Sequence, residues 1–245
     1  MYISTDYVFA GRPGEAPYEA GAATGPTNLY GQTKLDGEGA VLGAYRDAGR
    51  DGGAVVLRVP VLYGEVEGGE NKESAVNCLM DVVVKKGGAG KVAMDHWALR
   101  FPTNTEDVAR VCFGGFTSSF FLFLRRACRY CVCGEVLVAD CHGWWCADVA
   151  VRYLGEADKA SLPRVLQFSS EDKYTKYEMC ELFGEIMGLP IDHIQPNTEG
   201  NDPNASVQRP YDCHLSTKAL KDLDIDVSTQ DFVGWWRREC RAFRH

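Results

Sequence analysis

Residues 54–59 read AVVLRV and follow a pair of glycines at 52–53. Such an apolar run is typical of a short strand that is buried on both faces of a sheet. Upstream, residues 1–9 (MYISTDYVF) predict a strand that runs into a polar turn. Residues 29–48 predict a helix, with Asn28 placed to cap its N-terminus. A strand, a helix and a strand in this order predict a parallel α/β sheet.

Length and composition limit the classes of protein that this chain can represent. It has 245 residues, 45% of them hydrophobic, which is enough for one large domain or a domain with a smaller lobe. The net charge of −8 and the lack of a basic stripe argue against nucleic-acid binding. The longest apolar run, residues 120–124, is far shorter than the roughly 20 residues of a membrane helix. With no secretory signal pattern at the N-terminus, we expect a cytoplasmic protein without a membrane span.

After residue 64 the character of the sequence changes, which predicts the start of a smaller lobe. An acidic loop leads to a predicted helix at about 74–84, and further helices are expected near 105–111, 217–223 and 229–243. Residues 164–168 predict another strand. The clearest helix begins at Thr175, because Thr175 and Glu178 have the spacing of a capping box and an apolar face follows.

Tyr30 and Lys34 are four residues apart on the predicted helix 29–48, so they share one face. An ammonium beside a phenol favours the phenolate, and a tyrosine that transfers a proton near neutral pH needs such help. A solvated helix face is the alternative interpretation of this spacing, and the spacing alone does not exclude it.

The segments around these two residues carry a wider pattern: ISTDYVF at 3–9, NLYGQTKLDGE at 28–38, and a buried strand that ends in RVP at 58–60. Together they resemble the extended short-chain dehydrogenase/reductase superfamily, in particular its dTDP-4-dehydrorhamnose reductase-like branch. The resemblance implies that Thr5 binds a substrate carbonyl, Tyr30 transfers a proton and Lys34 holds the nicotinamide ribose. It also implies a supporting catalytic role for Asp6, and a wall beside the nicotinamide made of Pro60, Val61 and Leu62.

A narrower resemblance comes from LRVPVLYGEVE at 57–67, ESAV at 73–76, MDHW at 94–97, RFPT at 100–103, TKYEM at 175–179 and QRP at 208–210. These segments resemble the regulatory β subunits of methionine adenosyltransferase, which are members of the same branch. The resemblance implies a protein that binds NADP or NAD and attaches to the catalytic subunit that makes S-adenosylmethionine. Arg209 resembles a position that contacts a substrate phosphate, and an inter-lobe salt bridge is its alternative role.

The glycine-rich turn of a dinucleotide fold, Gly-x-x-Gly-x-x-Gly, does not occur in this sequence. We therefore expect a partial Rossmann-like parallel sheet without its N-terminal strands, followed by a smaller C-terminal α/β lobe. Residues 1–64 would be the C-terminal part of the dinucleotide-binding domain and 65–245 the smaller lobe, the two being interleaved in the family. Weakened cofactor binding and an aggregation-prone sheet edge are the expected consequences.

Residues 113–147 depart from the family pattern. A zinc site is one interpretation, because the segment holds several potential ligands: Cys128, Cys131, Cys133, Cys141, His142 and Cys146. The second half, however, lacks a paired spacing, and joining residues 108–112 directly to 148–154 restores one amphipathic helix. We therefore predict no metal site and interpret 113–147 as a non-family insertion, such as a translated intron.

Three functional hypotheses remain open from the sequence. The first is a non-catalytic, dinucleotide-binding regulatory subunit of methionine adenosyltransferase. The second is an NADPH-dependent reductase that acts on a 4-keto nucleotide sugar, and the third is a truncated product without activity. The sequence leaves open the substrate, the choice between NAD and NADP, and the oligomeric state.

Overall fold

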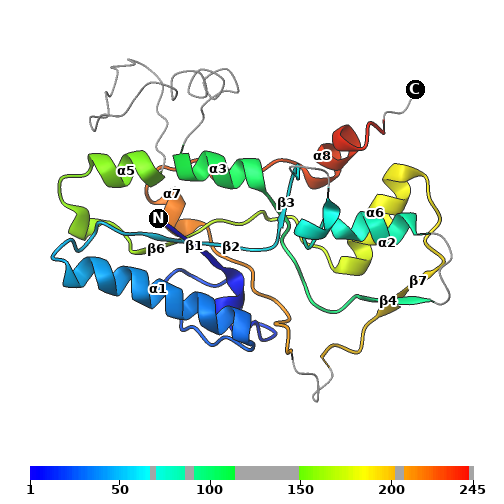
Figure 1. Ribbon diagram of the computed structural model, residues 1–245, viewed down its shortest axis with the longest axis horizontal. Coiled ribbons are helices and arrows are strands. Elements are labelled where there is room, and N and C mark those ends of the chain that lie inside the picture. The colour runs from blue at the N-terminus through cyan, green and yellow to red at the C-terminus, as the bar shows by residue number, and fades with distance from the viewer. Residues whose placement is uncertain (67–69, 86–90, 114–148, 202–206, 243–245) are drawn as a thin grey trace.

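A computed structural model describes residues 1–66, 70–85, 91–113, 149–201 and 207–242 (Figure 1). Its central sheet has the strand order β1-β2-β6, formed by β1 (Tyr2–Thr5), β2 (Val56–Val59) and β6 (Val165–Gln167). Both pairings are parallel, with Tyr2 beside Val56 and Val56 beside Val165. The predicted α/β class with a parallel sheet is therefore confirmed.

Helices cover both faces of this sheet (Figure 1). On one side lies α1 (Leu29–Asp47), which begins where the Asn28 side chain accepts a hydrogen bond from the Gly31 backbone N–H at 2.9 Å. On the other side lie α3 (Thr105–Phe113), α5 (Val149–Gly155) and α7 (Lys218–Lys221). Apolar side chains from these three helices pack on β2 and β6 and bury that face of the sheet.

A second group of elements surrounds another apolar core. It contains two parallel strand pairs, β3 (Leu62–Tyr63) with β5 (Thr103–Asn104) and β4 (Val92–Asp95) with β7 (Ile194–Asn197). The helices α2 (Cys78–Val84), α6 (Lys176–Met187) and α8 (Phe232–Glu239) pack around these strands. The large aromatic residues of this core are Tyr63, Phe183, Phe232, Trp235 and Trp236.

Short single-turn 3-10 helices complete the described elements: η1 (Asp6–Val8), η2 (Asn71–Glu73) and η3 (Lys159–Ser161). The predicted capping box at the start of α6 is confirmed, since Thr175 and Glu178 each satisfy a backbone N–H of the other. Gly188 ends α6 in the left-handed conformation with φ of 66°, where a side chain would be strained. Helix α8 is shorter than the predicted 229–243.

Two sequence predictions concern features that the structure leaves open. The division of the chain at residue 64 stays a prediction, and the sheet itself takes β6 from beyond that point. The insertion at 113–147, with its cysteine cluster, lies outside the described residues except for its first position. On either side of it, α3 and α5 contact each other through the same apolar core. Among the described residues, no helix is long and apolar enough to cross a membrane.

Candidate functional site

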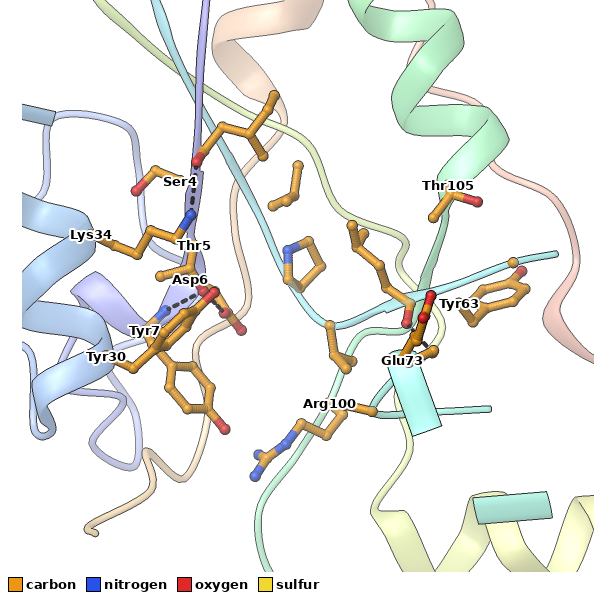
Figure 2. A pocket seen from close by; sticks show the side chains of 18 of the residues that line it. Ser4, Thr5, Asp6, Tyr7, Tyr30, Lys34, Tyr63, Glu73, Arg100 and Thr105 are labelled. Carbon is orange, nitrogen blue, oxygen red and sulfur yellow. Dashed lines mark hydrogen bonds between the residues drawn. The ribbon is translucent and has the colours of Figure 1, made fainter. Parts of the chain in front are cut away.

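A cavity of about 690 Å³ opens at the carboxyl ends of β1 and β2, the edge where open parallel sheets bind ligands (Figure 2). Residues from both groups of elements line it. Every candidate site residue of the sequence analysis except Arg209 is among them: Thr5, Asp6, Tyr30, Lys34, Pro60, Val61 and Leu62. Segments that lie far apart in the sequence therefore meet at one place.

The end of β1 supplies a buried hydroxyl and a buried carboxyl group. Thr5 Oγ1 donates to Asp6 Oδ1 at 2.9 Å and accepts from the Tyr7 backbone N–H at 3.3 Å, which caps η1. Burial raises the pKa of Asp6 to about 6, while the Thr5 hydrogen bond and the Arg100 charge oppose that rise. The buried Asp6 carboxyl is therefore protonated more readily than an exposed aspartate.

Helix α1 brings Tyr30 and Lys34 beside this strand end, next to Thr5 and Asp6 (Figure 2). The Tyr30 ring meets the Tyr7 ring edge-on, with 6.0 Å between centroids, and 54% of Tyr30 remains exposed. Lys34 Nζ donates to the Ile3 carbonyl oxygen at 3.3 Å and lies 5.5 Å from the Tyr2 ring centroid. Both side chains thus face one cavity, where the ammonium is held against β1.

A glycine allows α1 to come close to η1, the turn that follows β1. A Cβ on Gly31 would lie 2.1 Å from the Tyr7 carbonyl oxygen, well inside any normal contact. The residue beside Tyr30 therefore has no room for a side chain. This contact sets the distance between the first turn of α1 and η1.

The end of β2 forms an apolar wall. Val59, Pro60, Val61 and Leu62 line the cavity one after another, and β3 begins within this run. Arg209, by contrast, is exposed and does not line the cavity. Its backbone N–H donates to Asn201 Oδ1 at 3.0 Å. Its charge lowers the pKa of Lys176, which does line the cavity.

Two cationic residues of the cavity received no role in the sequence analysis. Arg100 is only 5% exposed and reaches toward the cavity from the loop that follows β4 (Figure 2). Its Nη1 donates to the Leu99 carbonyl oxygen at 2.9 Å, and its Nη2 lies 3.6 Å from Asp95 Oδ2. Burial lowers the pKa of Lys176, and the charges of Arg100 and Arg209 lower it further. The segments 100–103 and 175–179 had marked the family resemblance, but no local pattern placed these side chains in the cavity.

The arrangement fits the nicotinamide half of a dinucleotide. Pro60, Val61 and Leu62 give the cavity an apolar lining, and Thr5, Tyr30 and Lys34 give it hydroxyl and ammonium donors. A flat ring with a polar ribose needs both kinds of surface. For a metal ion, the described part of the chain offers no group of three or more histidine, cysteine, aspartate or glutamate side chains.

Comparisons with known proteins show which families this chain resembles. Residues 1–118 match the RmlD substrate binding domain family. Over all 245 residues the chain is 35% identical to methionine adenosyltransferase 2 subunit beta of Danio rerio. This chain is a relative of that subunit beta. It spans 60% of the length of the zebrafish protein.

One further sequence relative and one solved structure with a similar fold are reductases. The chain is 56% identical to dTDP-4-dehydrorhamnose reductase of Mycolicibacterium smegmatis over 110 residues, which are 44% of this chain and 29% of that protein. Its fold matches dTDP-4-dehydrorhamnose reductase of Bacillus anthracis, solved in complex with NADP, with a TM-score of 0.60 at 16% identity. That match covers 97% of this chain and 63% of the other. Both resemblances that the sequence predicted are confirmed.

Proposed function

We propose that this protein is a non-catalytic, NAD(P)-binding regulatory subunit that associates with the catalytic subunit of methionine adenosyltransferase. The observation that carries the proposal is the extent of the similarity to subunit beta, which runs through all 245 residues. The similarity to the mycobacterial reductase covers 110 residues. The strands of the central sheet and the residues of the second apolar core therefore all lie within the region that is similar to subunit beta.

The cavity residues have distinct roles in this proposal. Lys34 holds the nicotinamide ribose, Tyr30 and Thr5 bind its polar edge, and residues 60–62 pack against the ring. When bound, a reduced nicotinamide supplies a hydride; in a regulatory subunit it serves as a structural ligand. Residues 1–64 form the nicotinamide side of the site, and the later part of the chain contributes Arg100 and Lys176.

Calorimetry with NADPH and NADH tests the cofactor part of the proposal. We expect wild-type protein to bind, though more weakly than a fold that contains the glycine-rich turn. Lys34→Met should bind on the order of tenfold more weakly still, because one charge-assisted contact worth about 1.5 kcal/mol is lost. Lys221→Met is the matched control, since Lys221 is exposed on α7 and does not line the cavity. Equal binding by wild type and Lys34→Met would contradict the assigned role.

Co-purification tests the partner. The tagged chain, mixed with purified catalytic subunit of methionine adenosyltransferase, should elute with it in size-exclusion chromatography at micromolar concentration. Separate elution of the two proteins would refute the regulatory function. It would leave the cofactor result standing.

A reductase is the second candidate function, favoured by the 56% identity to the mycobacterial enzyme and by one cavity that holds Thr5, Tyr30 and Lys34. In that reaction Thr5 would bind the carbonyl oxygen of the substrate, and Tyr30 would donate a proton to the same atom. Oxidation of NADPH in the presence of dTDP-4-dehydrorhamnose would establish it. Absence of turnover, cofactor binding and partner binding together would support the third hypothesis, an inactive product.

A further inference from the structure

A buried ionic network ties α1 to the central sheet. Arg58 of β2 forms a two-pronged ion pair with Glu38 of α1: Nε lies 2.9 Å from Oε1, and Nη2 lies 2.7 Å from Oε2. Ser4 Oγ of β1 donates to the same Glu38 Oε1 at 2.5 Å. All three residues are at most 4% exposed. The Arg58 guanidinium also donates to the Ala20 carbonyl oxygen at 3.2 Å, and its carbon lies 5.0 Å from the Phe9 ring centroid.

Helix α1 buries few of its side chains, although Leu35 packs partly against the apolar core around Phe9 and Leu215. Of its 19 residues only Gly31 and Glu38 are buried, so Glu38 contributes the one fully buried side chain of the helix. A helix on a sheet is ordinarily held by an apolar stripe. Here the two-pronged ion pair holds the helix instead. Its hydrogen bonds are satisfied at one orientation and one position of α1 on the sheet, whereas an apolar contact is compatible with several.

Each member of the network adjoins a candidate site residue. Ser4 precedes Thr5 on β1, and Glu38 lies one helical turn beyond Lys34 on the same face of α1. Arg58 lies two residues before Pro60, at the end of β2. The network thus joins the three segments that supply the nicotinamide side of the cavity.

We propose that Glu38 and Arg58 are positioning residues, which set the register of α1 on β1 and β2 so that Tyr30 and Lys34 face the cavity. The inference rests on the proposed function, since it concerns the same nicotinamide-ribose site. Stability alone does not account for the pair, because well-packed apolar replacements of a buried ion pair are often equally stable. Apolar side chains in place of the pair would not restrict α1 to a single position on the sheet.

The decisive variant is the double replacement Glu38→Met/Arg58→Met, which leaves no buried charge without a partner. We expect its melting temperature to stay within a few degrees of wild type, while NADPH binds on the order of tenfold more weakly, because misplaced site groups lose affinity steeply. Lys218→Met/Asp222→Met, which removes an exposed ion pair between Lys218 of α7 and the residue that follows this helix, is the matched control and should bind as wild type does. Unchanged NADPH affinity in a stable double variant would overturn the proposal.

Amide hydrogen exchange gives a readout that needs no ligand. In the double variant, protection of residues 29–36 should fall at least about tenfold, while protection of β2 stays as in wild type. If wild-type protein binds no NADPH, the proposed function fails and this exchange result decides the inference alone. Unchanged protection of 29–36 would then overturn it.

Should the double variant fail to fold, Ser4→Ala replaces it. This change removes one hydrogen bond to Glu38 and leaves the ion pair intact. We expect a fewfold loss of NADPH affinity and a measurable loss of exchange protection at 29–36. Values equal to wild type in both measurements would overturn the positioning role.

Discussion

Replacing Gly31 by alanine tests how closely α1 approaches the end of β1. The added Cβ would meet the Tyr7 carbonyl oxygen at 2.1 Å and the Pro26 Cβ at 3.0 Å. The first obstacle is a backbone atom of the segment that holds Thr5 and Asp6, so no rotamer change relieves it. Either η1 or the first turn of α1 must move by roughly 1 Å before the contact reaches a normal separation.

The size of the effect follows from two opposing terms. Overpacking of this kind costs about 1–3 kcal/mol of unfolding free energy. Alanine returns up to about 1 kcal/mol relative to glycine in a helix, and less in the first turn, where Gly31 lies. We therefore expect Gly31→Ala to lower the free energy of unfolding by about 1–2 kcal/mol.

Gly39 provides the matched control within the same helix. It is exposed in the interior of α1 and has no atom within 4 Å of its Cβ position, so Gly39→Ala should stabilise the protein by up to about 1 kcal/mol. Urea unfolding followed by circular dichroism measures both variants, and NADPH titration reports on the displaced Tyr30. If Gly31→Ala unfolds at the same urea concentration as wild type or a higher one, the close approach of α1 to Tyr7 is wrong.

Three further predictions follow from single contacts. Burial raises the pKa of Asp6 from its usual 3.8 to about 6, so the folded state loses stability as pH rises between these values. Asp6→Asn should therefore be more stable than wild type by up to about 3 kcal/mol at pH 8 and by little at pH 4, and parallel pH profiles of chemical unfolding for the two proteins would contradict this. Thr175→Ala removes the cap of α6 and should cost about 1 kcal/mol in thermal unfolding, whereas Thr175→Ser keeps the hydroxyl and should cost much less. A Cβ on Gly64 would lie 2.1 Å from Thr105 Oγ1, so Gly64→Ala should destabilise the wild-type protein more than it destabilises the Thr105→Ala variant. If the changes in unfolding free energy of the two single variants add up to that of the double variant, the contact is contradicted.

Local sequence signals predicted the elements that depend on neighbouring residues. Asn28 caps α1, and Thr175 with Glu178 forms the capping box of α6, because these hydrogen bonds join residues only three apart. The apolar run at 54–59 likewise predicted β2, and a strand, a helix and a strand predicted parallel pairing. The i, i+4 spacing of Tyr30 and Lys34 was enough to predict that both lie on one face of α1.

Only the tertiary structure decided which of these elements and side chains contact one another. The sequence alone determined the three strands of the central sheet, the helix between the first two, the caps, and the placing of Tyr30 with Lys34 on one helix face; it did not predict β3, β4, β5 or β7. The fold decided that Arg100 and Lys176 share their cavity, that Glu38 of α1 binds Arg58 of β2, and that burial moves the pKa of Asp6 toward neutrality. Each of these depends on contacts between residues far apart in the chain, or on exclusion of water by such contacts. No local pattern records them, because they exist only once the helices have packed on the sheet.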